Sequence, residues 1–249
     1  MSGFFCFVGA ALGGGAAIVE HPKCMYGSEH ARPIRAVILD LDGTLVDTAG
    51  EIALALNETL AALGLPVVSL ASATALIGRG VHSLVERAVE EAGATVDIEQ
   101  AVEMFEASYG RLVATRAALF PGVREGLDAM RAAGLRLGVV TNKPRLFTER
   151  LLAHAGIDGF FDAVVAGDDG IRRKPSGDML AAAASRMGTR IDETLMLGDS
   201  ENDVRAARAA GCRVWCVPYG YNEGRPADSL ECDRMVDTVL HAARLLPAP

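Results

Sequence analysis

Four positions along the chain carry side chains suited to binding a metal ion or a phosphate, and each follows a short apolar run. The four groups are Asp40 with Asp42, Thr141 with Asn142, Asp168 with Asp169, and Asp199. Short apolar runs of this kind are typical of strands that are buried on both faces. Because open α/β sheets bind ligands beyond the carboxyl ends of their strands, four polar strand ends on one rim predict a binding site.

The residue types indicate what such a site could do. Carboxylates are the hard oxygen ligands that Mg²⁺ prefers, and Asp40 and Asp199 would supply them. A phosphate ester is an anion that repels nucleophiles, so the site also needs positive charge. Lys174 would neutralise phosphoryl charge and relieve repulsion among the carboxylates. Asp203, four residues beyond Asp199, would either add a ligand through water or hold Lys174.

The elements that must position these side chains alternate between strand and helix. Strands are expected at 36–39, 135–140, 163–166, 194–197 and 214–217. Helices are expected at 123–133, 145–155, 178–187 and 204–210. Strands that alternate with helices of roughly ten residues predict a parallel sheet covered on both faces. The expected fold class is therefore α/β, with a Rossmann-like doubly wound core.

Residues 48–118 follow a different pattern, because no convincing strand interrupts them. Apolar residues recur at intervals of three and four between Ile52 and Leu63, and Gly64 stands where a C-terminal cap belongs. Further helices are expected at 81–92 and 98–117. The chain is thus expected to divide into a core of residues 33–47 and 119–249 and a small all-helical domain of residues 48–118, inserted after the first strand.

The segment Asp40-Leu41-Asp42-Gly43-Thr44 resembles the first motif, Asp-x-Asp-x-Thr, of the haloacid dehalogenase-like (HAD) phosphohydrolase superfamily. Its three further motifs are matched in order by Thr141, Lys174 and the acidic stretch 198–203. Each match follows an expected strand, which is the structural context that such a motif requires. The resemblance extends from the first strand nearly to the C-terminus.

The resemblance implies a phosphatase mechanism. Asp40 takes the place of the nucleophile that forms an aspartyl-phosphate, and Asp42 that of the general acid/base, kept protonated by neighbouring negative charge. Mg²⁺ is the implied cofactor, and its implied ligands are Asp40, the backbone carbonyl of Asp42, Asp199 and Asp203.

The resemblance also places residues around the substrate. Thr141 and the backbone of Asn142 would hydrogen-bond the transferring oxygens, and Gly43 and Thr44 are expected beside the substrate. The helical insertion corresponds to the cap of this superfamily, which closes over the site, excludes water and selects the substrate.

Within the superfamily, three stretches resemble phosphoglycolate phosphatases: 77–80 (Ile-Gly-Arg-Gly), 139–144 and 218–222. Arg79 could fork onto a substrate carboxylate through two hydrogen bonds, although many phosphoglycolate phosphatases carry another residue there. The expected function is hydrolysis of 2-phosphoglycolate or a similar small phosphate ester. The alternatives are a phosphatase of a sugar phosphate, an amino-sugar phosphate or pyrophosphate, a phosphomutase, or a non-catalytic module that binds a phospho-ligand.

Simpler interpretations apply to single residues. The two aspartates of the first motif could merely form a turn at a strand end, and Thr141 could cap the following helix. Lys174 and Arg79 could be solvated, and Asp203 could simply favour a helix N-terminus. Asp168 and Asp169 are more often loop acids, and Asp169 is left out of the predicted site.

Composition excludes several other functions. The net charge is −8 and no run of Lys or Arg offers a track for a nucleic acid. The five cysteines (Cys6, Cys24, Cys212, Cys216 and Cys232) are too scattered for a disulfide framework or a zinc site, and favour a reduced, cytoplasmic protein. A small phosphorylated substrate is the expected partner, and both a monomer and a homodimer are compatible with the sequence.

Residues 1–32 stand apart as an N-terminal extension. The apolar stretch from Phe4 to Val19 is shorter than the ~20 residues that span a bilayer, and no basic residue precedes it. Three interpretations are open: a loose tail or a start at Met25, an additional packed segment, or a weak membrane anchor. No membrane partner is expected.

Overall fold

The computed structural model describes residues 32–246. Six strands form one sheet in the order β5-β4-β1-β6-β7-β8, and all neighbouring strands are parallel. Their bounds are β1 Ala36–Leu39, β4 Arg136–Val140, β5 Ala163–Val165, β6 Thr194–Gly198, β7 Arg213–Cys216 and β8 Arg234–Met235. β1 lies between β4 and β6, so the side chains that follow these three strands emerge at the same edge of the sheet.

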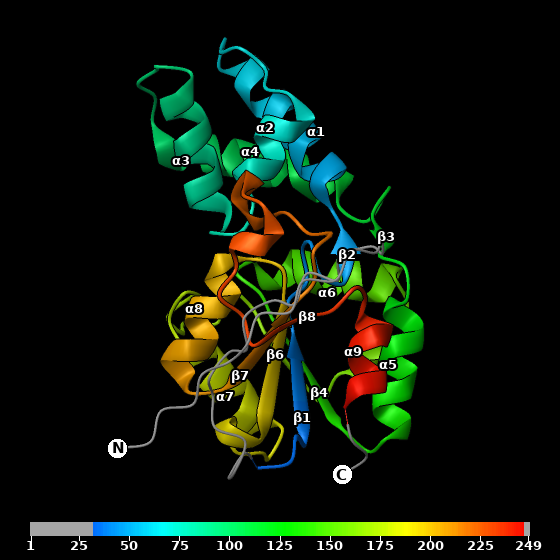
Figure 1. Cartoon of the computed structure of the whole chain (residues 1–249). Helices are drawn as coiled ribbons and strands as arrows, with labels where there is room; N and C mark the ends of the chain where they lie inside the picture. The colour runs from blue at the N-terminus through cyan, green and yellow to red at the C-terminus, as the bar shows by residue number, and fades with distance from the viewer. Residues whose placement is uncertain (1–31, 247–249) are drawn as a thin grey trace, which may run out of the picture. The chain divides into compact units, whose positions relative to one another are not determined.

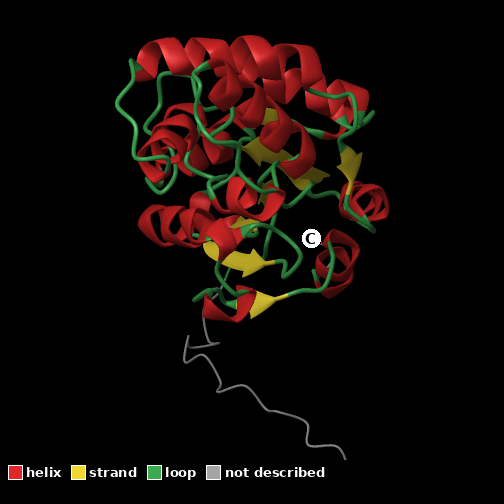
Figure 2. Cartoon of the chain, turned by 90° about the horizontal axis from the view of Figure 1, so that it is seen from above, coloured by secondary structure: helices red, strands yellow, loops and turns green. Residues whose placement is uncertain are grey.

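Helices cover both faces of this sheet (Figures 1 and 2). One apolar cluster joins Val37 and Leu39 of β1 to α5 Val123–Ala132, α6 Arg145–His154 and α9 Val239–Leu245. The other joins Ala36 and Ile38 to α7 Asp178–Arg186 and α8 Glu201–Ala210. The alternation along β1 places successive side chains on opposite faces, as a strand must. The predicted α/β doubly wound core is confirmed.

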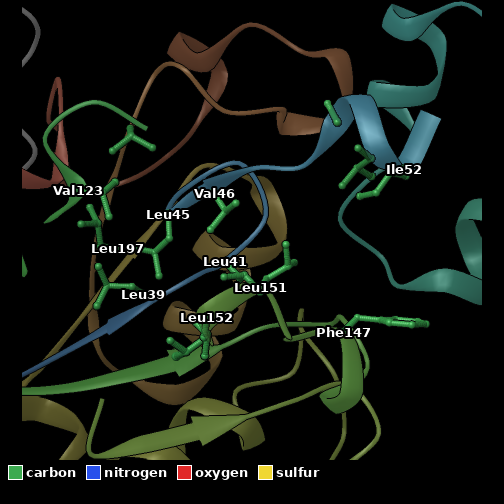
Figure 3. Packing of buried hydrophobic residues seen from close by; sticks show 14 of the residues in the cluster. Leu39, Leu41, Leu45, Val46, Ile52, Val123, Phe147, Leu151, Leu152 and Leu197 are labelled. Carbon is green, nitrogen blue, oxygen red and sulfur yellow. The ribbon is translucent and has the colours of Figure 1, made fainter. Parts of the chain in front are cut away.

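The loop after β1 buries two leucines among its polar residues. Leu41 and Leu45 are fully buried and continue the cluster that contains Leu39 of β1 and Leu197 of β6 (Figure 3). The aspartates between these leucines therefore lie on a loop that packing holds in place. Val46 extends the same cluster toward the helical insertion.

Four helices stand above the sheet edge in Figure 1, with bounds α1 Ala49–Ala62, α2 Leu70–Ala75, α3 Val81–Glu91 and α4 Ile98–Leu112. The two strands that flank them, β2 Val46–Asp47 and β3 Ala118–Leu119, pair antiparallel. The entry and exit of the insertion are thus tied together. The division between a cap, 48–118, and a core stays a prediction, and the two names are used below for these parts of the chain.

Several element bounds differ from the sequence prediction. The helix expected to reach Ala117 ends at Leu112, because the buried carboxylate of Glu51 accepts hydrogen bonds from the backbone N–H groups of Ala114, Arg116 and Ala117. α8 begins at Glu201 rather than at residue 204, and its first turn carries a capping box.

Short elements escaped the sequence prediction altogether. α2, α9 and β8 were not expected, since so few residues show no readable period. Gly64, at a φ of 72°, ends α1 as predicted. The predictions made for Cys6, Cys24 and the rest of the N-terminal extension up to residue 31 lie outside the described residues. Among residues 32–246, no helix has both the length and the apolar character that crossing a membrane requires.

Candidate active site

Three carboxylates and one ammonium meet at the carboxyl edge of the sheet. Oxygen atoms of Asp40, Asp199 and Asp203 lie within 4.8 Å of one another, and all three residues are buried. Lys174 Nζ lies 2.7 Å from Asp40 Oδ1 and 2.7 Å from Asp203 Oδ1, and it donates to the Val140 carbonyl at 3.1 Å. Lys174 is therefore not a solvated surface residue but the central cation of the cluster.

Asp199 is fixed by the motif that follows β1 and by the loop that follows β7. Its Oδ1 accepts from Thr44 Oγ1 at 2.8 Å, and its Oδ2 accepts from the backbone N–H of Tyr221 at 2.7 Å. Two glycines make room for it: a Cβ added at Gly43 or Gly220 would lie 2.5 Å or 2.2 Å from the nearest Asp199 side-chain atom. Thr44 and Gly43, expected beside the substrate, are thus seen to position Asp199.

Asp203 supports this loop. Its Oδ2 accepts from the backbone N–H groups of Asp199 and Ser200, at 3.2 and 3.1 Å, and from Ser200 Oγ at 2.8 Å. Its Oδ1 faces Lys174. The side chain therefore begins α8, orients the Asp199 backbone and holds Lys174 at the same time.

The charges of the cluster favour a divalent cation. Burial raises the pKa of Asp40 well above its ordinary value, and Asp203 and Asp199 raise it further, against the lowering effect of Lys174. Burial and the charge of Asp203 raise the pKa of Asp199 to about 7. One ammonium does not neutralise three buried carboxylates, and a hard cation bound to their oxygens would. The donor set fits Mg²⁺.

Asp42 lies in the same loop as Asp40, two residues further on, and has a cation of its own. Lys143 Nζ donates to Asp42 Oδ1 and Oδ2 at 2.9 and 3.0 Å, and Thr48 Oγ1 donates to Oδ1 at 2.6 Å. Asp42 is therefore in direct contact with a positive charge, and the expectation that neighbouring negative charge keeps it protonated stays a prediction. Burial disfavours the ammonium of Lys143, yet Asp42 raises the pKa of Lys143 above its ordinary value.

Thr141 and Asn142 follow β4, as predicted. Thr141 Oγ1 accepts from the Lys143 backbone N–H at 3.2 Å, and α6 starts only after Pro144, so Thr141 does not cap that helix. The Asn142 amide donates to the carbonyls of Gly78 and Lys174 at 3.0 and 2.9 Å and accepts from the Lys174 N–H at 3.0 Å. The Asn142 side chain thus joins the cap loop to the core.

The cap and the core enclose a pocket beside Asp40. Its polar lining comes from Asp40, Asp42, Thr141, Asn142, Lys143 and Lys174. Its apolar wall comes mainly from the cap, and two wall residues, Ile52 of α1 and Phe147 of α6, are labelled in Figure 3. Both the cap and the core therefore contribute to the wall of the pocket.

Arg79 does not line this pocket, although Gly78 and Gly80 beside it do. Its guanidinium forks onto the Glu223 carboxylate, Nε to Oε1 at 2.7 Å and Nη2 to Oε2 at 2.6 Å. In this structure the two-point contact expected with a substrate carboxylate is made with the protein instead.

The polar residues that follow β5, Asp168 and Asp169, do not belong to the site. Asp169 pairs with Arg145 at 2.6 Å and with Arg186 at 3.3 Å, and Asp168 accepts from the Arg145 backbone N–H at 2.8 Å. Both aspartates bind Arg145 at the start of α6, and Asp169 also binds Arg186 at the end of α7. The loop-acid interpretation fits them, and the expectation of four contributing strand ends is reduced to three.

Sequence reasoning missed three residues at the site: Lys143, Tyr109 and Tyr221. Lys143 follows the polar pair after β4, and a lysine at such a strand end is a signal that could have been used. Tyr109 lies on α4 among apolar residues, where its spacing indicates only a core position. Tyr221 donates its N–H to Asp199, and no sequence pattern reveals that contact.

Comparison with known proteins agrees with this geometry. A family model described as haloacid dehalogenase-like hydrolase matches residues 34–211. The chain belongs to the haloacid dehalogenase-like hydrolase family, and the predicted resemblance is confirmed. It is accordingly an enzyme of the hydrolase class.

Curated relatives within this family carry a more specific name. A phosphoglycolate phosphatase of Nitrosospira multiformis is 43% identical over 223 residues, which cover 86% of this chain and 96% of the relative. One of Thiobacillus denitrificans is 42% identical over 218 residues, covering 86% and 96%.

Solved structures of the same fold include a predicted phosphoglycolate phosphatase from Haemophilus somnus. It has a TM-score of 0.81 and 30% identity, over 86% of this chain and 98% of that one. CbbY from Rhodobacter sphaeroides in complex with phosphate has a TM-score of 0.71 and 28% identity, over 83% and 95%.

Proposed function

We propose that this protein is a Mg²⁺-dependent phosphatase that hydrolyses a small phosphate monoester, 2-phosphoglycolate in the first place. The observation that carries the proposal is the position of Lys174, 2.7 Å from both Asp40 and Asp203 and beside the buried Asp199. A nucleophilic carboxylate, a cation and metal-binding oxygens are thereby gathered at one point, where a phosphoryl group needs them.

Each step of the reaction falls to a residue of the site. Asp40 attacks phosphorus while the bond from phosphorus to the leaving oxygen breaks, and Asp42 donates a proton to that oxygen. Water then attacks the phosphorus of the aspartyl-phosphate while the bond from phosphorus to the Asp40 oxygen breaks, so that inorganic phosphate leaves and the Asp40 carboxylate is restored. Asp42 takes the proton from the attacking water. Thr141 and the Asn142 backbone hold the transferring oxygens. General acid/base assistance of this kind contributes roughly 10²–10⁴ in rate.

Asp40, Asp199 and the backbone carbonyl of Asp42 would hold the Mg²⁺, with Asp203 orienting the ligand loop. The bound cation would neutralise charge on the phosphoryl oxygens and on the carboxylates. Lys174 shares this task through its contacts with Asp40 and Asp203.

The size and lining of the pocket support a small substrate. Its cavity measures about 50 Å³, and since one water needs roughly 10–15 Å³, the space suits a short organic group better than a hexose. The names of the curated relatives support the same choice. A sugar phosphate, an amino-sugar phosphate and pyrophosphate are the competing substrates.

A phosphatase screen tests the proposal. Purified protein is assayed for phosphate release from 2-phosphoglycolate, hexose phosphates, amino-sugar phosphates and pyrophosphate, with and without Mg²⁺. We expect Mg²⁺-dependent turnover with the highest kcat/KM for 2-phosphoglycolate. A preference for a hexose phosphate would reject the substrate, a requirement for a sugar bisphosphate activator would indicate a phosphomutase, and no turnover of any ester would reject the phosphatase.

A reduced, cytoplasmic setting remains part of the proposal. Cys212, Cys216 and Cys232 are free thiols, and Cys212 and Cys216 are buried. This state is the one that a reducing compartment maintains.

A further inference from the structure

The pocket contains two lysines among the described residues that line it, and each contacts a different aspartate of the first motif. Lys174 contacts Asp40 and therefore belongs to the phosphoryl end. Lys143 contacts Asp42, the proposed proton donor to the leaving oxygen, at 2.9 and 3.0 Å, and therefore belongs to the leaving-group end. A leaving group that is itself an anion would meet Lys143.

Lys143 can bind an anionic leaving group from its present position. An ammonium has three hydrogen-bond donors, and the contacts of Lys143 Nζ with Asp42 involve two acceptor oxygens of one carboxylate. The side chain is almost wholly buried, so the charge is weakly screened. Its backbone is held by bonds from the Lys143 N–H to Thr141 Oγ1 and from the Gly167 N–H to the Lys143 carbonyl.

Tyr109 gives independent support for a polar ligand at this end. It is 1% exposed and lines the pocket from the cap helix α4, yet its hydroxyl has no partner at hydrogen-bond geometry. Lys143 Nζ lies 4.7 Å from the centre of its ring. A buried hydroxyl without a partner is unfavourable, and it points to a group that arrives with the ligand.

The phenol is also rigidly placed. Phe105 stacks on its ring at a centroid distance of 5.6 Å, and Phe147 of the core meets it edge-on at 5.0 Å. A side chain held by contacts from both the cap and the core can discriminate between leaving groups of different shape. It keeps its position when a leaving group does not fit.

From these contacts, and resting on the proposed function, we infer that Lys143 and Tyr109 form the subsite for a carboxylate on the leaving group of the substrate. In 2-phosphoglycolate the carboxylate is attached to the carbon that carries the scissile oxygen, so it lies close to Asp42 and within the reach of Lys143. The pair therefore determines specificity, whereas Arg79 is engaged with Glu223 outside the pocket.

The test compares two esters of similar size, 2-phosphoglycolate and ethyl phosphate, of which only the first carries a carboxylate. The quantity measured is the ratio of their kcat/KM values at saturating Mg²⁺. We expect wild type to favour 2-phosphoglycolate. Lys143→Met should reduce that ratio by roughly 10- to 100-fold, as the loss of one buried charge partner does. Tyr109→Phe should reduce it by roughly 3- to 10-fold, since one hydrogen bond to a charged group is lost.

Thermal melting separates recognition from folding. Tyr109→Phe should leave Tm unchanged or raised, because its hydroxyl makes no hydrogen bond of good geometry that the variant would lose. Ser108→Ala on the same helix is the matched control: Ser108 bonds Glu58 and does not line the pocket, so this variant should lower Tm and leave the ratio unchanged.

Equal losses on both esters in Lys143→Met and an unchanged ratio in Tyr109→Phe would overturn the inference. If Lys143→Met does not fold, Tyr109→Phe decides alone. Wild-type turnover of both esters without preference would overturn the inference but spare the proposed phosphatase, and turnover of neither would reject both.

Discussion

Arg79 of the cap and Glu223 of the core form a two-point ion pair, with contacts of 2.7 and 2.6 Å. Glu223 also accepts from the Asn202 amide at 3.2 Å, and its backbone has a positive φ of 51°. The turn that carries it follows Tyr221, whose N–H bonds Asp199. The cap loop is therefore connected, through one short segment, to a proposed metal ligand.

Breaking this ion pair should weaken cap closure. Arg79→Ala and Glu223→Ala should each lower kcat/KM by roughly 2- to 10-fold, for 2-phosphoglycolate and ethyl phosphate alike. Arg79 is about half exposed, so solvent screens the pair and the coupling measured in a double-mutant cycle should stay below about 1 kcal/mol. High salt should reduce the difference between wild type and the variants.

The double-mutant cycle of Arg79 and Glu223 also tests the hypothesis from the sequence that Arg79 binds a carboxylate of the substrate. In that case Arg79→Ala would impair only the ester that carries a carboxylate, and the effect would persist in the Glu223→Ala background. We expect non-additive effects instead, because each variant removes the same contact.

Asp40→Asn should abolish turnover while the protein stays folded. Loss of a catalytic nucleophile costs on the order of 10⁴-fold or more in kcat. Because burial raises the pKa of Asp40, a neutral amide is no less compatible with this environment than the carboxylate, and Tm should not fall. Phosphate release, circular dichroism melting and acid-quench mass spectrometry of wild type measure rate, fold and the covalent phosphoryl group. Substantial turnover by Asp40→Asn would assign the nucleophile to another residue.

Gly220→Ala should damage the metal site through sterics alone. Its Cβ would lie 2.2 Å from the Asp199 side chain, which would have to move. We expect Mg²⁺ affinity to fall by roughly 10- to 100-fold, the range typical when groups supporting a ligand are disturbed. Gly50→Ala in α1 is the control, since its Cβ meets nothing within 4 Å and alanine favours a helix. Calorimetric Mg²⁺ titration of both variants would reveal whether the loss is specific.

Thr44→Val should have a milder effect on the same ligand. It removes the 2.8 Å hydrogen bond to Asp199 Oδ1 and keeps the volume of the side chain. Mg²⁺ affinity should fall by roughly 10-fold, at the low end for a residue that orients a ligand. If Thr44→Val left Mg²⁺ affinity intact but raised KM, Thr44 would belong to the substrate, as the sequence first indicated.

The stability of the metal-free protein should fall as pH rises from about 4 to about 7. The pKa of Asp199 is raised from 3.8 to about 7 by burial and by Asp203, so over this window the folded state keeps a proton that the unfolded state loses. The stabilisation that protonated Asp199 contributes to the folded state is complete below pH 4 and is lost as pH passes 7. Asp199→Asn should lack this component, and the difference in Tm between it and wild type, in chelator, measures it.

Mg²⁺ should reverse this loss of stability at higher pH, because it binds the ionised carboxylates. At a concentration about 100 times Kd it adds about 2.7 kcal/mol, or roughly 5–10 °C in Tm for a chain of this size. The Mg²⁺-induced shift should therefore grow between pH 5.5 and 8. A shift that is the same at both pH values would show that the cation binds elsewhere.

The sequence by itself determined the α/β core and the identity of the main cluster. A strand buried on both faces must be apolar throughout, so the run Ala36–Leu39 and the polar residues after it were readable without coordinates. Asp40 and Asp199 followed, because parallel strands deliver their ends to one edge. Lys174 and Asp203 were identified through the resemblance of their motifs to those of the superfamily. The apolar run and the polar residues that follow it are local patterns, so they can be recognised in the sequence alone.

Only the tertiary structure decided which partner each of these groups has. Lys143 pairs with Asp42 across 101 residues of sequence, and Arg79 pairs with Glu223 across 144. Thr44, Gly43 and Gly220 proved to position Asp199, and the Tyr109 hydroxyl proved to lack a partner. Contacts of this kind depend on how separate elements pack together, and no period or spacing along the chain encodes the distance between two side chains from separate elements.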